Sequence, residues 1–104
     1  MSFLNSGHRR YLRQQAHHLK PTVQIGRNGV TEMVIEAVNE ALERHELIKV
    51  KFNEGQEEKR VVADQIAGET KSDLVQIIGN IIVLFRYQHD PSKRKVSLPN
   101  DYED

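Results

Sequence analysis

Residues 22–29 read TVQIGRNG, and the rest of the chain is arranged around this stretch. Val23 and Ile25 alternate with polar residues, which predicts a short strand that stops at Gly26. A long amphipathic run opens at Thr31, only a few residues later, and predicts a helix. The sequence therefore predicts a strand, a tight glycine-bounded loop and a helix in immediate succession.

The loop itself has two interpretations. The simpler one is a tight turn, because Gly-x-x-Gly alone is a weak motif. The functional one is an anion-binding turn, in which Gly26 and Gly29 adopt backbone conformations closed to other residues and let a ligand approach without a Cβ in the way. The free amides at the start of the next helix favour negative charge. Arg27 would offer a fixed fork of donors at the tip, and the Asn28 amide would donate and accept.

Apolar periodicity predicts the remaining elements. Pro21 is expected to end the first helix, and the Gly79-Asn80 pair predicts a type II′ hairpin turn. Two βαβ units would give parallel pairs, and the hairpin an antiparallel one. The fold class is therefore a single α/β domain, α-β-α-β-α-β-β, with a four-stranded mixed sheet. Helices are expected at 8–18, 31–45 and 56–69, and strands at 22–25, 47–52, 73–78 and 81–85.

The same periodicity predicts which side chains are buried. In the first helix the expected apolar stripe is Leu12, Ala16 and Leu19, and the nearly unbroken apolar strand at 81–85 should be covered on both faces. The stripes of the second and third helices are expected to contain Met33, Val34, Ala37, Val38, Ala41 and Leu42, then Val61, Val62, Ala63, Ile66 and Ala67.

Composition excludes several classes of protein. The 104 residues include no cysteine, so there is no disulfide, thiolate zinc site or cysteine nucleophile. No apolar run approaches the roughly 20 residues of a membrane span. The N-terminus lacks the basic and apolar regions of a signal peptide. We expect a soluble, cytoplasmic protein that is monomeric and makes no membrane contact.

The net charge of zero hides a strong sorting of charges along the chain. Residues 1–29 contain five arginines and lysines and no acid, whereas residues 30–70 contain ten acids and five bases. Residues 71–104 contain five of each. This asymmetry predicts a basic face that binds a partner of dense negative charge and an acidic face left to solvent.

The first predicted helix is the most basic element. It holds three arginines and the histidines His8, His17 and His18, with no acid to form intrahelical ion pairs. Such rows are commonly a solvated face, but these cations are also available to an external anion. The candidate binding cations along the whole chain are Arg9, Arg10, Arg13, Lys20, Arg27, Lys49, Lys51, Lys93, Arg94 and Lys95.

Metal binding and catalysis find little support in the sequence. His17 and His18 are adjacent and point about 100° apart on a helix, so they do not converge on a metal. No histidine lies beside a second catalytic group at a convincing spacing. We expect no catalytic residue, no metal and no cofactor.

Four segments together resemble a known family. They are residues 19–32, 41–51, 75–86 and 94–99. They are similar to the YhbY-type CRM domain (chloroplast RNA splicing and ribosome maturation), and in particular to its bacterial stand-alone members. The resemblance implies a fold like the C-terminal domain of bacterial translation initiation factor three. It also implies RNA binding through residues 26–29 and the nearby basic surface.

The resemblance further implies a biological setting. Stand-alone members associate with precursors of the large ribosomal subunit, so the expected partners are ribosomal RNA and pre-ribosomal particles. Residues 1–98 would form the RNA-binding domain. Residues 99–104 form an acidic tail, expected to be flexible, that departs from the family pattern.

Two other functions stay open. One is a general RNA-binding module like the KH domain, which clamps RNA with a similar loop. The other is a protein-interaction module in which the acidic helix 31–45 or the tail docks a ribosomal protein. Because exposed aromatic residues are few, we expect RNA recognition led by shape and backbone, with modest sequence preference.

Overall fold

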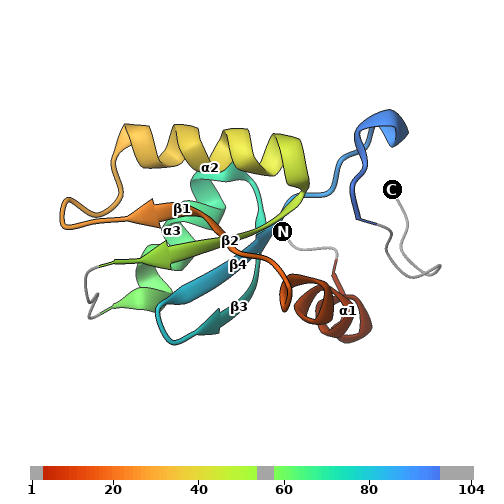
Figure 1. The fold of residues 1–104 in the computed structure, drawn as a ribbon, viewed down its shortest axis with the longest axis horizontal. Helices are drawn as coiled ribbons and strands as arrows, with labels where there is room; N and C mark the ends of the chain where they lie inside the picture. The colour runs from red at the N-terminus through yellow and green to blue at the C-terminus, as the bar shows by residue number, and fades with distance from the viewer. Residues whose placement is uncertain (1–3, 54–57, 97–104) are drawn as a thin grey trace.

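The structure is a computed structural model that describes residues 4–53 and 58–96. It confirms the predicted class, a single α/β domain with a four-stranded mixed sheet (Figure 1). The elements follow the predicted order, with one short 3-10 helix after the last strand. They are α1 (Ser6–Ala16), β1 (Pro21–Ile25), α2 (Glu32–His45), β2 (Leu47–Phe52), α3 (Lys59–Thr70), β3 (Asp73–Ile78), β4 (Ile81–Phe85) and η1 (Pro91–Lys93).

The strand order is β1-β2-β4-β3, which differs from the expected pairing. β1 and β2 are parallel, but β2 and β3 do not pair, because β4 lies between them and runs antiparallel to both. The cause is the composition of β4, whose buried side chains alternate between two apolar cores. Such a strand is more stable at the centre of the sheet than at its edge. Pro21 begins the edge strand β1, where a missing N–H breaks no central ladder.

The hairpin between β3 and β4 has the predicted two-residue turn. Ile78 and Ile81 pair directly across it. Gly79 has a φ of +54°, while the φ of Asn80 is not positive, as the type II′ turn requires.

Helices cover the two faces of the sheet unequally (Figure 1). α2 and α3 pack on one face and enclose the larger core, which includes Ile25, Val50, Phe52 and Leu84. α1 packs on the other face over a smaller core around Leu12. Because α1 covers only part of that face, the rest of it stays open beside the helix.

α1 begins and ends earlier than predicted. The Asn5 Oδ1 atom accepts from the His8 N–H at 2.8 Å, and the His8 Nδ1 atom accepts from the Asn5 N–H at 3.2 Å. This capping box fixes the helix start at Ser6. His8 is consequently buried, so its expected place among the surface cations is wrong. The helix ends at Ala16, which leaves Leu19 outside it and partly exposed, and Pro21 does not terminate it.

The buried stripes of α2 and α3 are narrower than predicted. Met33 is 80% exposed and Val61 is 59% exposed, and Ala37 is exposed as well. The buried side of α2, which includes Val38, faces the sheet. Because successive residues of a helix are rotated by about 100°, Met33 and Ala37 point away from that side toward solvent. The predicted start of the third helix lies outside the described residues; the described helix begins at Lys59.

Candidate nucleic-acid interface

The glycine loop forms a closed turn at the end of β1. The Gly29 N–H donates to the Gly26 carbonyl at 3.1 Å. Gly29 has a φ of +68°, a backbone conformation that favours glycine. Gly26 does not have a positive φ, so its backbone conformation is open to other residues. No atom lies within 4 Å of a Cβ built at Gly26. Arg27 and Asn28 are exposed at the tip, as predicted.

At the first turn of α2, side chains of neighbouring residues already interact with the free N–H groups of the helix. The Thr31 hydroxyl accepts from the Val34 N–H at 3.2 Å, which confirms the predicted cap. Glu32 lies in the first turn, where its negative charge interacts favourably with the helix dipole. The same charge would repel a phosphate there. Attraction of an anion to this loop therefore depends on Arg27 and on the exposed backbone more than on the helix terminus.

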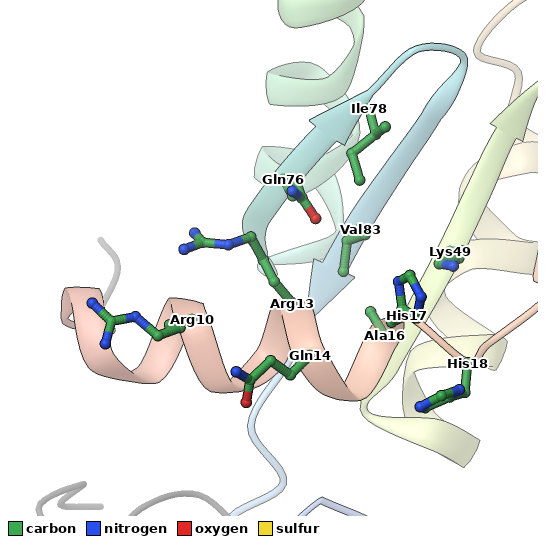
Figure 2. Close-up of a pocket in the computed structure, with 10 residues that line it drawn as sticks. All are labelled: Arg10, Arg13, Gln14, Ala16, His17, His18, Lys49, Gln76, Ile78 and Val83. Carbon is green, nitrogen blue, oxygen red and sulfur yellow. The ribbon is translucent and has the colours of Figure 1, made fainter.

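A groove of about 500 Å³ runs between α1 and the open face of the sheet (Figure 2). Two of the predicted arginines line it from α1, and Lys49 lines it from β2. No acid is among its lining residues. They are Arg10, Arg13, Gln14, Ala16, His17, His18, Lys49, Gln76, Ile78 and Val83.

The cations of the groove and the loop are not neutralised within the protein. In residues 4–53 and 58–96, no hydrogen bond or ion pair involves the side chains of Arg10, Arg13, Arg27, Lys49 or Lys51. The ion pairs of this part of the chain lie instead on α2, on α3 and around the segment after β4. A high local density of free positive charge is the arrangement that attracts a polyanion.

The open sheet face connects the groove to the loop. Lys49 and Lys51 alternate with the buried residues of β2 and so project on the face that α1 partly covers. Gln24 of β1 is paired in register with Lys51, and Arg27 follows it by three residues. Lys49 and Lys51 thus lie on the sheet face between the groove and the end of β1, where the loop begins. We call Arg10, Arg13, Lys49, Lys51 and Arg27 the basic track.

Two predicted lysines lie in a different pocket. Lys20 and Lys95 line a hollow of about 460 Å³ that shares no lining residue with the groove. Leu19 and Val96 give this hollow an apolar wall. The structure therefore does not place Lys20 and Lys95 in the basic track.

Three other predicted cations make contacts within the protein. The Arg9 Nη1 atom donates to the Leu74 carbonyl at 2.8 Å and so holds α1 against β3. The Lys93 ammonium lies 3.8 Å from a Glu43 carboxylate oxygen. Arg94 donates to the Gln88 carbonyl at 2.8 Å and stacks over the Tyr87 ring, while a second donor reaches the His89 carbonyl at 3.3 Å. These contacts give each of the three a structural role.

Sequence reasoning missed the polar side chains that share the groove with the cations. Gln76 lies on β3, and Gln14 lies on α1 beside His17 and His18 (Figure 2). Gln76 was detectable as a polar residue among the apolar residues that follow Asp73 in this strand. Among the described residues no group of three or more histidine, aspartate or glutamate side chains is placed to hold a metal. None of the described helices is long and apolar enough to cross a membrane.

Comparison with known proteins agrees with this geometry. The chain is 43% identical to an RNA-binding protein of Haemophilus influenzae over 95% of this chain and 98% of the relative. It is 41% identical to "Probable RNA-binding protein YqeI" of Bacillus subtilis over 92% of this chain and 99% of the relative. The solution structure of SAV1595 from Staphylococcus aureus has a similar fold, with a TM-score of 0.79 and 36% identity, covering 93% of this chain and all of that one.

The family model for the CRS1 / YhbY (CRM) domain matches residues 4–86. This range contains α1, the glycine loop, the whole sheet and both covering helices. It therefore includes all the residues of the basic track. The chain belongs to the CRS1 / YhbY (CRM) domain family of RNA-binding proteins.

Proposed function

We propose that the protein binds ribosomal RNA in precursors of the large ribosomal subunit and acts there by binding alone, without catalysis. The observation that supports this most directly is the basic track. It contains five cations without partners among the described residues: three line the groove, Lys51 lies on the same face of the sheet, and Arg27 is exposed in the loop. A nucleic acid fits such a track, because its phosphates release counterions when lysines and arginines replace them. The relatives named as RNA-binding proteins favour RNA.

The helices of the opposite layer expose acids, and α2 has a clear excess of them over bases. Glu36, Glu40 and Glu43 are exposed on α2, and Asp64 and Glu69 are exposed on α3. Because these acids are on the helices that cover the other face of the sheet, RNA is repelled from that side and oriented toward the track. This polarity supports one defined RNA-binding face.

The ribosomal setting rests on the resemblance to stand-alone CRM proteins. Relatives named as RNA-binding proteins match this chain over nearly their full length. We propose that the protein works as a monomer in the cytoplasm, where ribosomal precursors mature. The glycine loop here joins a strand directly to a helix, which favours the CRM assignment over a KH-like module.

The test is sedimentation of cell extract on a sucrose gradient. Wild-type protein should travel with large-subunit precursors, and the Arg27→Glu variant should stay near the top. Arg44→Glu is the matched control, since it makes the same charge change on the exposed side of α2. Both variants must first show wild-type unfolding curves. Wild-type protein that stays at the top would contradict the ribosomal proposal, and co-sedimentation of Arg27→Glu would show that the loop is only a structural turn.

A further inference from the structure

The groove beside α1 contains apolar and uncharged polar side chains, which phosphate binding does not require. Its lining is partly apolar: Ile78 is 55% exposed at one end, and Ala16 and Val83 lie buried behind the surface (Figure 2). Phosphates are bound by cations and N–H donors and gain nothing from an apolar surface. A planar base does gain from such a surface, because its faces are apolar and its edges carry donors and acceptors.

A polar side chain stands beside this apolar lining without a partner. Gln76 is half-buried on β3, and no hydrogen bond to its amide occurs among the described residues. A glutamine amide both donates and accepts, so it can pair with the edge of a base. Figure 2 shows Gln76 on the same side of the hairpin as Val83, facing the space bounded by α1.

The rim supplies stacking surfaces and charge. Arg13 and His17 extend from α1 in opposite directions, Arg13 toward β3 and His17 toward Lys49 on β2 (Figure 2). Imidazole rings and guanidinium planes are surfaces on which unstacked RNA bases are commonly held. A volume of about 500 Å³ is also within the range of about 300–1,000 Å³ that small-ligand sites occupy.

We propose that this groove receives one unpaired RNA nucleotide. The base lies against the exposed Ile78 with its edge on Gln76, and the flanking phosphates contact Arg13 and Lys49. A nucleotide within an A-form duplex cannot enter, because its base is stacked and paired inside the helix. The inference rests on the proposed RNA-binding function and narrows it to RNA that carries a bulge, loop or single-stranded end.

The experiment compares two hairpin RNAs with the same stem, one fully paired and one with a single bulged 2-aminopurine. Affinity is measured by fluorescence anisotropy at fixed salt, and base stacking by 2-aminopurine emission. Wild-type protein should bind the bulged hairpin at least about fivefold tighter, since base stacking contributes that much or more. The 2-aminopurine emission should change on binding.

Gln76→Ala should lower affinity for the bulged hairpin more than affinity for the paired hairpin, because it removes the hydrogen bond to the base edge. Ile78→Ala is a second variant at an exposed position and should reduce the 2-aminopurine response. Gln65→Ala is the matched control, because Gln65 is an exposed glutamine of α3 on the acidic layer. It should behave as wild type.

The outcomes separate the two proposals. Equal binding of both hairpins by wild type, with strong salt dependence, would overturn the nucleotide site and leave RNA binding intact. An equal loss of both affinities in Gln76→Ala would also overturn it, since Gln76 would then support the fold or the charge of the groove only. Failure of wild type to bind either RNA would overturn both proposals.

Discussion

The carboxylate of Glu46 accepts a hydrogen bond of 2.6 Å from the main-chain N–H of Lys95. Glu46 is fully buried at the junction of α2 and β2, and its carboxylate also accepts from the N–H groups of Val96 at 2.9 Å and Gln88 at 2.6 Å. Three N–H donors stabilise the buried charge in the place of a cation. This side chain, together with the packing of Tyr87 and Val96 on the smaller core, fixes the segment after β4 to the body of the domain.

Replacing Glu46 should therefore loosen that segment. Glu46→Gln keeps the size of the side chain but turns one acceptor oxygen into a donor that faces other donors. We expect the free energy of unfolding to fall by about 1–3 kcal/mol, the usual cost of an unsatisfied buried polar group. Urea denaturation measures the loss, and hydrogen exchange at Lys95 and Val96 should accelerate. Glu40→Gln, at an exposed position of α2, is the control and should cost less than about 0.5 kcal/mol.

Arg86 makes a second connection between distant segments. Its guanidinium donates to the Asn39 side chain at 2.9 Å, the Asn39 carbonyl at 3.1 Å and the Thr70 carbonyl at 2.9 Å. It thereby holds the ends of α3 and β4 against α2. Arg86→Ala should lower the free energy of unfolding by about 2–3 kcal/mol, as expected for lost hydrogen bonds to a charged group.

RNA affinity separates this structural role from a binding role. Arg86→Ala should retain wild-type affinity at temperatures where it is fully folded, because the guanidinium is bonded within the protein. A tenfold loss of affinity in the folded variant would show that Arg86 contacts RNA. Arg60→Ala, which removes an exposed pair with Asp64 on α3, should change neither stability nor affinity appreciably.

The two loop glycines should respond differently to alanine. Gly29→Ala places a Cβ on a residue with a φ of +68° and should cost about 1–2 kcal/mol of stability. Gly26→Ala meets neither a positive φ nor a neighbouring atom, so stability should change by less than about 0.5 kcal/mol. If RNA backbone lies against this turn, Gly26→Ala will still weaken RNA binding. Unchanged affinity and unchanged stability in Gly26→Ala would mean that the loop has no close contact with RNA.

The sequence predicted the elements of this fold because each carries its own local signal. The β2 strand alternates strictly, Thr31 caps α2, and Gly79 permits the hairpin turn, so all three were found at or near their observed places. The position of β4 between β2 and β3 depends on which strands pair, and periodicity within a strand contains no such information. The apolar character of residues 81–85 on both faces was the one available indication that β4 is central.

The candidate site was predictable in part for the same reason. Charge sorting indicated Arg13, and the alternation of residues 47–52 indicated Lys49; neither side chain has a partner among the described residues. The sequence did not distinguish these two cations from Arg9 or Arg94. Arg9 donates to a carbonyl that is distant in the sequence, and Arg94 donates to a carbonyl across a local bend of the chain. The groove was not predictable, because it forms only when α1 is placed beside Gln76 on a distant strand.

The salt dependence of RNA binding provides the sharpest test of the basic track. Each cation that contacts a phosphate should contribute roughly 0.7–0.9 to the slope of log affinity against log salt concentration. Arg13→Gln and Lys49→Gln should therefore each reduce the slope by about that amount and weaken binding at low salt. Lys93→Gln should leave the slope unchanged, because Lys93 is paired with Glu43 outside the track. The measurement is a titration series of one RNA at several salt concentrations. Equal slopes for Arg13→Gln and Lys93→Gln would show that phosphates bind a surface other than the groove.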